Sequence, residues 1–581
     1  MLDPQLRTQI EEIIGRYPDG KSALMPALSL VQKSSACFIT DEDLAEVAKL
    51  IDVSVAEAFG VRTYYTMYNR KPVGTYHLQV DTNIPAMLMG AGKIVEHLQV
   101  ALSIQVGETT DDGLFTLSVV EDLASCGTCP VIQVNDRYYE NMTPEKTDRL
   151  LQSLREGVMP ETVDEANFGT ECNILLKHRG VADSAKIETY LADGGYQALA
   201  KALTMKPAEV SAEVMKSTIR GRGGAGFPMG LKWSFLPKNV DKPVYLICNA
   251  DEGEPGTFKD RQIMEYDPHL LIEGMTIAGF AIGSKLGFIY IRGEFEWIAD
   301  ILNVALDEAR AQGKLGADIL GSGFDFDIIV HLGAGAYVCG EETALIESLE
   351  GKRGNPRLKP PFPAVEGLYG CPTIVNNVET LANVPFIVDQ GADAYLAIGE
   401  NANNFGPKIY GISGHVNKPG TYEYPLGTSL DTLLEAAGGV GGKMKAVIVG
   451  GLSVPILTPE EAKGLSMDYD TCIKKGTMLG SGGIIVMNDT ANIPEVALRT
   501  IEFYAHESCG QCIPCRKGSH AIKMLLRRMV KGDGKPEDID TILRICATVK
   551  GATLCPTGDA FAMPIEAMIT KFRSEFEALV S

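Results

Sequence analysis

Arg220-Gly221-Arg222-Gly223-Gly224-Ala225-Gly226-Phe227-Pro228 is the stretch from which the fold of the largest domain is read. Its glycines give the spacing G-x-G-x-x-G, which alone is a weak indication of a nucleotide site. A Rossmann dinucleotide fingerprint follows a strand, whereas residues 212–219 have a helical pattern. We therefore expect an unusual phosphate-binding loop, with exposed backbone N–H groups and arginines that cradle the phosphate.

Strand-like and helical runs alternate downstream of this loop. The strand-like runs are Val244–Cys248, Gly287–Arg292 and Asp325–Leu332, and the helical runs are Asp267–Ile282, Phe295–Gln312 and Glu341–Leu349. This alternation predicts a Rossmann-like α/β sheet covered by helices over residues 173–400.

Two loops of this domain follow strands and have side chains suited to a ligand. Asn249-Ala-Asp251-Glu252-Gly253-Glu254 would line a crevice at the carboxyl end of a strand. An acidic turn without a ligand explains it equally well. In the loop 333–342, glycines allow a ligand to approach the backbone closely. The paired Glu341 and Glu342 would repel phosphate, and they suit a sugar hydroxyl or a base better.

The rest of the chain forms smaller units of a multidomain α/β protein. Residues 1–78 are predicted to be helical, with Asp3 and Ser54 as helix caps. The remaining units are a small α/β domain at 79–156, a linker at 157–172, a β-rich unit at 401–490 and a helical end at 491–581.

A cysteine cluster lies near the C-terminus, in Ser508-Cys509-Gly-Gln-Cys512-Ile-Pro-Cys515-Arg516. Three thiolates on one tight loop can bind three corners of a four-iron cluster, which then needs a fourth ligand. Cys555, which follows a helical segment, is the candidate, whereas the alternative Cys546 lies inside a helical pattern that indicates burial. A structural zinc site also takes four cysteines, but as two separated pairs.

Composition excludes some classes of function. The net charge of −22 argues against nucleic acid as a partner, because the chain cannot neutralise a phosphate backbone. Charged and glycine residues interrupt the best membrane candidate, Leu270–Ile291, which indicates a buried helix followed by a buried strand. We see no N-terminal signal and expect no membrane insertion. Most of the thirteen cysteines stand singly in apolar runs, which indicates a reducing, cytoplasmic compartment.

Six motifs of this chain occur in the same order in the NADH-binding flavin subunit of respiratory complex I, which the chain closely resembles. The same family includes diaphorase subunits of NAD-dependent hydrogenases and formate dehydrogenases. The motifs are Gly221–Trp233, Asn249–Asp260, Gly333–Ala344, Lys359–Ala364, Ile374–Thr380 and Glu507–Arg516. The resemblance covers about residues 173–575, and the β-rich unit resembles the family's ubiquitin-like (β-grasp) insert.

The resemblance implies the cofactors FMN and one four-iron ([4Fe-4S]) cluster, with NADH as substrate. The residues implied to hold FMN are Gly223, Lys232, Asn249, Asp251, Tyr337, Gly340, Asn376 and Asn377. Those implied to contact NADH are Phe227, Phe235, Glu254, Glu341, Glu342 and Phe362. Hydride would pass directly from nicotinamide to flavin, so no side chain need act as acid or base. Single electrons would then leave through the cluster at Cys509, Cys512, Cys515 and Cys555.

The first 156 residues resemble the thioredoxin-like two-iron subunit of the same complexes, so the chain looks like a fusion of the two. The family's four ligand positions read Asp81, Ala86, Asp122 and Cys126 here, and Cys129 lies outside the pattern. A two-iron cluster takes four thiolates, or two imidazoles in place of two of them. We therefore expect the thioredoxin-like domain to hold no [2Fe-2S] cluster.

The function expected is that of an NADH dehydrogenase (diaphorase) module that passes electrons to other redox subunits. The alternative is a soluble NAD(P)H oxidoreductase or transhydrogenase subunit with a different acceptor. A scaffold subunit without turnover conflicts with the flavin, nucleotide and cluster motifs. We expect a cytoplasmic location, either free or at the periphery of a membrane complex.

Overall fold

A parallel sheet in the order β8-β7-β6-β9 forms the centre of the molecule. A computed structural model describes residues 2–580 except 35–36, 163–164, 239–240 and 400. The strands are β6 (Tyr245–Ala250), β7 (Leu286–Ile291), β8 (Asp327–Leu332) and β9 (Thr373–Asn377). The Rossmann-like sheet expected for this domain is present, and Leu270–Ile291 forms most of α13, a turn and β7, as predicted.

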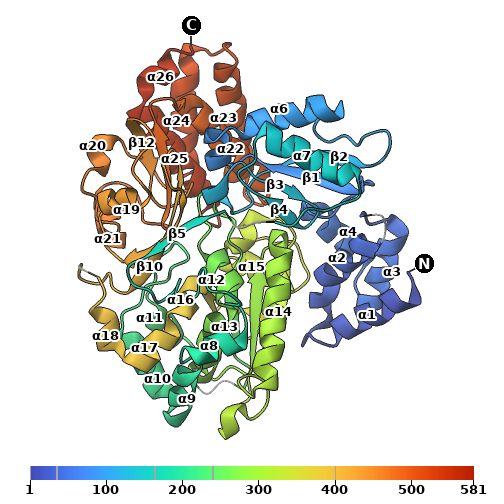
Figure 1. The fold of residues 1–581 in the computed structure, drawn as a ribbon, viewed down its shortest axis with the longest axis vertical. Coiled ribbons are helices and arrows are strands. Elements are labelled where there is room, and N and C mark those ends of the chain that lie inside the picture. Colours follow the sequence, from blue (N-terminus) through green and yellow to red (C-terminus); the bar gives the residue numbers. More distant parts are fainter. Residues whose placement is uncertain (1, 35–36, 163–164, 239–240, 400, 581) are drawn as a thin grey trace.

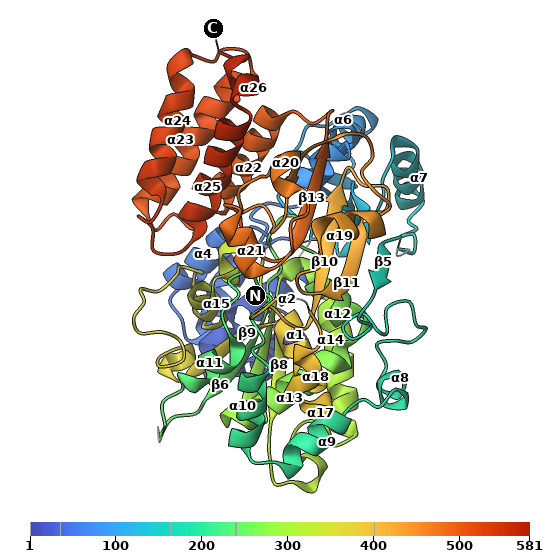
Figure 2. The same cartoon turned by 90° about the vertical axis from the view of Figure 1, so that its left-hand side faces the viewer.

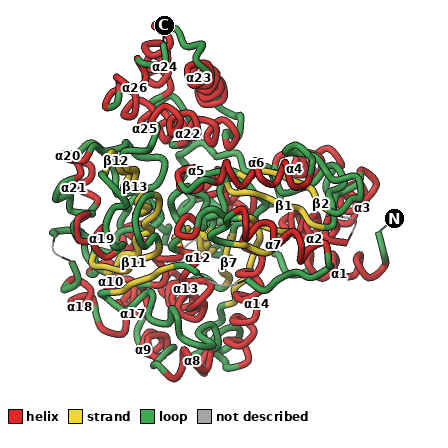
Figure 3. The backbone as a smooth tube through the Cα atoms, turned by 45° about the horizontal axis from the view of Figure 1, so that its top comes forward, coloured by secondary structure: helices red, strands yellow, loops and turns green. Residues whose placement is uncertain are grey.

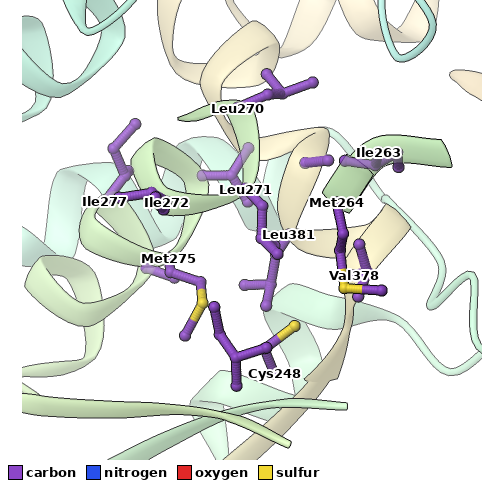
Figure 4. Close-up of a cluster of buried hydrophobic side chains, with 14 of the residues drawn as sticks. Cys248, Ile263, Met264, Leu270, Leu271, Ile272, Met275, Ile277, Val378 and Leu381 are labelled. Atoms are coloured by element: carbon purple, nitrogen blue, oxygen red, sulfur yellow. The ribbon is translucent and has the colours of Figure 1, made fainter. Parts of the chain in front are cut away.

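Helices of the same domain cover one face of this sheet. They are α8 (Ile187–Ala192), α9 (Gln197–Thr204), α10 (Pro207–Lys216), α11 (Met229–Ser234), α12 (Asp260–Tyr266), α13 (Pro268–Ile282), α14 (Glu296–Ala311), α16 (Val378–Ala382), α17 (Val384–Gln390) and α18 (Ala392–Leu396). Figure 4 shows the side chains of Met275 and Leu381 above Cys248 of β6. All three are fully buried, which is typical of a parallel sheet whose strands are covered by helices.

The opposite face is covered by the N-terminal helices (Figure 1). These are α1 (Pro4–Ile14), α2 (Leu24–Ser34), α3 (Asp41–Ile51) and α4 (Val55–Tyr64), joined there by α15 (Glu342–Leu349). The Tyr17 hydroxyl lies 2.9 Å from Nδ1 of His331 on β8, and the Tyr65 hydroxyl donates to Ser348 of α15 at 2.7 Å. The helical region that the sequence suggested as a separate unit is therefore one layer of the central domain.

A thioredoxin-like sheet in the order β2-β1-β3-β4 follows the N-terminal helices. Its elements are β1 (Tyr76–Asp81), α5 (Ile84–Leu88), α6 (Ala91–Leu102), β2 (Phe115–Val120), β3 (Ile132–Val134), β4 (Arg137–Tyr139) and α7 (Pro144–Arg155). Strand β1 pairs parallel with β2 and antiparallel with β3. The small α/β domain is present, but its first strand begins at Tyr76, before the predicted start of the domain at residue 79.

The β-grasp unit has the sheet order β12-β13-β10-β11-β5. Its elements are β10 (Pro407–Gly414), β11 (Gly420–Pro425), α19 (Leu430–Ala436), β12 (Met444–Ile448), α20 (Pro459–Ala462), α21 (Tyr469–Lys474) and β13 (Gly483–Asn488). Strand β5 (Asn167–Thr170) comes from the stretch predicted to be a linker, and it pairs parallel with β11. The linker prediction was wrong at these residues, because β5 extends the β-grasp sheet.

The C-terminal part projects from the upper end of the molecule (Figure 2). It contains α22 (Ile493–Glu507), α23 (Ile513–Val530), α24 (Pro536–Val549), α25 (Thr557–Lys571) and α26 (Arg573–Glu577). Figure 3, where helices are red, shows these helices apart from the yellow strands. Within the described part of the chain, no helix is both long and apolar enough to cross a membrane.

Candidate functional site

A cavity of about 850 Å³ lies where the carboxyl ends of β6 and β9 and the segment Gly340–Glu342 meet the glycine-rich loop. Residues of both predicted sets line it. From the FMN set these are Gly223, Lys232, Asn249, Gly340, Asn376 and Asn377. From the NADH set they are Phe227, Phe235, Glu341, Glu342 and Phe362. The three phenylalanines are 41%, 51% and 56% exposed, so their rings are accessible for stacking on a planar ligand.

Three predicted residues lie elsewhere. Asp251 and Tyr337 line a neighbouring cavity of about 650 Å³, which lies between the central domain, the thioredoxin-like domain and helix α22. The Tyr337 hydroxyl donates to Glu254 at 2.7 Å, and the backbone N–H of Ser453 donates to the same carboxylate at 2.7 Å. Glu254 thus ties the sheet domain to the β-grasp unit, and burial raises its pKa. The structure does not bring these three side chains into the larger cavity.

Lysines neutralise the paired glutamates at the cavity wall. Lys232 Nζ lies 3.3 Å from Glu342 Oε2 and donates to the backbone oxygen of Val375 at 3.0 Å. Lys359 Nζ lies 2.7 Å from Glu341 and 3.4 Å from Glu342. Burial would raise the pKa of Glu342, but the two lysines outweigh it and lower that pKa. Lys359 was not predicted as a site residue, although it opens the motif Lys359–Ala364.

Glu341 has a second contact that the sequence did not reveal. Its side chain accepts from the backbone N–H groups of Thr343 at 2.9 Å and Ala344 at 3.0 Å, which makes it the N-cap of α15. A carboxylate is stabilising at a helix N-terminus because the N–H groups there have no partner within the helix. The position of Glu341 is therefore fixed by the fold as well as by Lys359.

The arginines of the glycine-rich loop do not face the cavity. Arg222 is fully buried, and its guanidinium donates to the backbone oxygens of Phe405 at 2.7 Å and Pro407 at 3.1 Å. Arg220 forms an ion pair with Asp470 at 3.1 Å. The prediction that these arginines cradle a phosphate was wrong, because they attach the loop to the β-grasp unit. The glycines remain suited to a close ligand.

Two of these glycines show how tightly the loop is held. A Cβ at Gly223 would lie 3.0 Å from Cβ of Asn377. Gly226 has φ of +63°, and a Cβ there would lie 2.6 Å from the Tyr469 ring. A side chain at Gly226 would clash with Tyr469 and one at Gly223 would press on Asn377, so the loop passes close to β9 and α21. Gly221, Gly223 and Gly226 also line the larger cavity, so the backbone of the loop is accessible to a ligand there.

The four predicted cluster cysteines lie near one another. Cys509 is in the loop before α23, Cys512 and Cys515 begin that helix, and Cys555 precedes α25. The backbone N–H of Leu554 donates to Cys512 Sγ at 3.3 Å. Burial raises the pKa of Cys515 to about 11, with a hydrogen bond to Ser508 acting against it and the charges of Cys555 and Cys509 acting with it. No group of three His, Cys, Asp or Glu side chains in the described residues is placed for a single metal ion.

The rejected alternative, Cys546, is fully buried inside α24, as the helical pattern indicated. Pro556, the residue after Cys555, lines the same cavity as Lys232 and Phe227. The cysteine-bearing loop therefore forms part of the wall of the nucleotide cavity.

The degenerate two-iron site is closed by a buried polar network. The side-chain amide nitrogen of Asn83 lies 3.0 Å from Asp81, 2.8 Å from Asp122 and 3.3 Å from Cys126 Sγ. Arg292, at the end of β7, forms an ion pair with Asp122 at 2.9 Å. The family's ligand positions thus converge, as the resemblance implied. Asn83 and Arg292 were not predicted, because neither belongs to the ligand pattern.

Family descriptions match the chain in the same order as these parts. The thioredoxin-like [2Fe-2S] ferredoxin description covers residues 10–155, and the Nuo51 FMN-binding domain covers 214–386. The SLBB domain covers 409–456, and the NADH-ubiquinone oxidoreductase-F iron-sulfur binding region covers 495–579.

Two curated relatives agree with these descriptions, and each is named as an NADH-quinone oxidoreductase subunit. The relative in Rhizobium meliloti is 52% identical over 409 residues, which are 70% of this chain and 97% of that protein. The relative in Rickettsia conorii is 54% identical over 372 residues, which are 63% of this chain and 88% of that protein.

Two solved structures share nearly the whole fold. A chain of the NAD+-reducing [NiFe]-hydrogenase in the air-oxidized state is 30% identical, with a TM-score of 0.84, and the match covers 96% of this chain and 93% of that one. For the H2-reduced state the TM-score is 0.87 at 30% identity, with 97% and 93% covered.

The fold and the two sites define an NADH oxidoreductase with a flavin domain and an iron–sulfur domain. FMN and a four-iron cluster are the cofactors of this class, and NADH is the substrate. The chain belongs to the family of NADH-quinone oxidoreductase subunits that contain the Nuo51 FMN-binding domain. The resemblance, the fold class and the enzyme class predicted from the sequence are confirmed.

Proposed function

We propose that the larger cavity holds FMN beside NADH, and that single electrons leave through the four-iron cluster to another redox subunit. The observation that carries this proposal is Pro556, which follows Cys555 and lines the cavity together with Lys232 and Phe227. A cluster held by Cys555 would therefore lie next to the nucleotide cavity. Electron transfer between the two sites then needs no domain movement.

The residues of the cavity have distinct proposed roles. Gly223, Asn249, Asn376 and Asn377 hold FMN, and the positive charge of Lys232 favours the reduced, anionic flavin. When bound, the flavin supplies the change from a two-electron donor to single electrons. We keep Asp251 and Tyr337 as FMN contacts, reached from the neighbouring cavity. We likewise keep Glu254 among the NADH residues, where it acts by holding Tyr337.

The aromatic residues and the glutamates orient NADH. The exposed rings of Phe227, Phe235 and Phe362 stack on the nucleotide, and Glu341 and Glu342 contact its hydroxyl groups. No proton has to be transferred by a side chain, so alignment is what these residues contribute. Lys359 joins the set because it holds both glutamates in place.

We further propose that the thioredoxin-like domain holds no two-iron cluster. The amide of Asn83 lies among the three ligand positions that have polar side chains, and Arg292 neutralises Asp122. Ala86 has no atom that can ligate iron. Electrons then have one route out, through the cluster at the C-terminal helices.

The partner proposed is another redox subunit. The relatives are named as subunits of an NADH-quinone oxidoreductase, and the matching structures are chains of a hydrogenase. A free-standing NAD(P)H oxidoreductase or transhydrogenase subunit is the competing candidate. Purification of the native protein without a tag separates the two, because only the first retains partner subunits.

The central experiment uses Cys512→Ser, with Cys546→Ser as the matched control. The wild-type chain should bind one FMN and about four irons, with the EPR signal of a single reduced cluster. Cys512→Ser should lose that signal and keep NADH oxidation with ferricyanide, which can accept electrons at the flavin. Cys546→Ser should keep both. A full cluster in the Cys512 variant, or a two-iron signal in the wild type, contradicts the proposal.

A further inference from the structure

We propose that Lys259 and Asp260 together fix the side-chain amide of Asn377, so that an N–H group and not the oxygen is offered to the ligand of the larger cavity. The proposal rests on the proposed function, because it deepens the role given to Asn377 in holding FMN. In the described structure neither Lys259 nor Asp260 lines that cavity, so both are positioning residues that act through Asn377.

Asn377 is the last residue of β9 and lies at the wall of the cavity. It is the partner of Asn249 in the parallel pairing of β6 with β9. A Cβ at Gly223 of the glycine-rich loop would lie 3.0 Å from the Cβ of Asn377. Three segments that line the cavity therefore meet at this side chain, and the direction of its amide decides which polar group a ligand meets there.

Both ends of the Asn377 amide are bonded to other groups of the chain. Its oxygen accepts from Lys259 Nζ at 3.2 Å and from the backbone N–H of Glu379 at 3.1 Å. Its nitrogen donates to Asp260 Oδ2 at 2.7 Å. An amide nitrogen has two hydrogens, and this nitrogen makes its second contact, a long one of 3.4 Å, with the backbone oxygen of Asn249. The second hydrogen is therefore the one available to a ligand.

The chemistry of these two partners permits one orientation of the amide. An ammonium group has donors and no acceptor, whereas a carboxylate accepts, so the amide oxygen has to face Lys259 and the nitrogen has to face Asp260. Burial lowers the pKa of Lys259, but Asp260 and Glu379 outweigh it and raise that pKa, so the lysine keeps its charge. A reversed amide would place two donors together and two acceptors together.

The Lys259–Asp260 pair is itself held by a buried charge network. Lys259 Nζ lies 2.6 Å from Asp260 and 2.9 Å from Glu379, and the three side chains are 2%, 4% and 0% exposed. Glu379 also pairs at 2.7 Å with Lys408 of β10, which is fully buried. In the described residues, the side chains of Glu379 and Lys408 form no hydrogen bond with the Asn377 side chain. These two residues therefore share the network without contacting the amide, which makes them a control.

The test compares two variants of the full-length protein that each lose one buried cation and one buried anion. Lys259→Met/Asp260→Leu removes both partners of the amide, and Lys408→Met/Glu379→Gln is the control that keeps them. FMN is removed from each protein and titrated back, and its Kd is read from the quenching of flavin fluorescence. We expect the Kd to rise at least about tenfold in the first variant, because the amide can then reverse, and to stay within about threefold of wild type in the control. The single variants Lys259→Met and Lys408→Met repeat the comparison, so it does not depend on the folding of one protein.

A second comparison tests whether the Lys259–Asp260 pair acts through Asn377. In an Asn377→Ala background, Lys259→Met/Asp260→Leu should change the Kd for FMN by less than about twofold, because no amide is left to orient. Additive effects, or equal Kd values in the first variant and its control, would overturn the proposal.

The KM for NADH with ferricyanide, measured at saturating FMN, should be the same in Lys259→Met/Asp260→Leu as in wild type. A raised KM would mean that the whole cavity has changed shape, which also overturns the proposal. A wild-type protein that binds no FMN would instead refute the proposed function, so the two failures are distinguishable.

Discussion

The buried ion pair between Arg292 and Asp122 joins the thioredoxin-like domain to the flavin domain, and Arg292→Met tests its contribution. The two side chains are 6% and 3% exposed, and Arg292 also donates to the backbone oxygen of Asp122 at 2.7 Å. Removing one partner leaves a carboxylate in a site where water cannot solvate it. Breaking a buried pair in this way costs about 3–5 kcal/mol of the free energy of unfolding.

The second variant, Arg292→Met/Asp122→Asn, separates charge from packing. A neutral amide at 122 has no charge to bury, so the double variant should recover about 2 kcal/mol relative to Arg292→Met. Arg573→Met is the control, because its pairs with Asp540 and Glu577 are exposed on both sides and should contribute little to stability.

The assay is urea denaturation followed by tryptophan fluorescence in a Trp233→Phe background, which leaves Trp297 as the emitting residue. Its ring lies 4.6 Å from that of Tyr138, so it reports on the contact between the two domains. We expect the midpoint of the transition seen by Trp297 to fall in Arg292→Met and to rise again in the double variant. A single variant within about 1 kcal/mol of wild type, or no recovery in the double variant, refutes the reasoning.

Three further predictions concern the nucleotide cavity and the closed two-iron site. Glu342→Gln should raise the kcat/KM ratio of NADPH to NADH about tenfold in steady-state assays, because Lys232 then has no carboxylate partner and can attract a 2′-phosphate, whereas Lys359 keeps Glu341. An unchanged ratio means that Glu342 does not face the ribose. Gly226→Ala should lose about 2–4 kcal/mol of stability and most of its bound FMN, because of the positive φ and the nearby Tyr469 ring; thermal unfolding and flavin absorbance test this. Burial and the neighbouring Asp122 raise the pKa of Asp81 to about 7, so the folded chain keeps a proton that the unfolded chain releases near pH 3.8. Wild-type stability should therefore fall as pH rises between these values, by up to about 4 kcal/mol relative to Asp81→Asn; parallel stability curves for the two proteins contradict this.

The sequence predicted those parts of the fold whose signals are local. The alternation of strands and helices around Val244–Cys248 predicted the central sheet, and the burial of Cys546 followed from its helical pattern. The spacing of Cys509, Cys512 and Cys515 indicated the cluster site because three ligands lie on one loop. These signals extend over a few residues, so distant contacts do not change them.

The features that the sequence missed depend on long-range packing. Strand β5 is only four residues long and is stabilised by β11, which lies some 250 residues further along the chain. Arg222 was expected at a phosphate, but its partners are backbone oxygens beyond residue 400, which no local pattern shows. The same holds for Arg292 and Asn83. Charged residues in a glycine-rich loop can face a ligand or the interior, and only tertiary structure decides between them.

The layer of helices α1–α4 on the central sheet has a consequence for how the protein is made. A parallel sheet exposes an apolar surface unless helices cover both of its faces. Here the helices that cover one face, α1–α4, end more than 150 residues before the first strand of the sheet. During synthesis, helices α1–α4 are made before the sheet that they cover. They can dock on it only after β6 to β9 have been synthesised. Because cover and sheet are one polypeptide, the docking is intramolecular and independent of protein concentration. Joining the two in one gene thus ensures that no flavin domain is produced without its second cover.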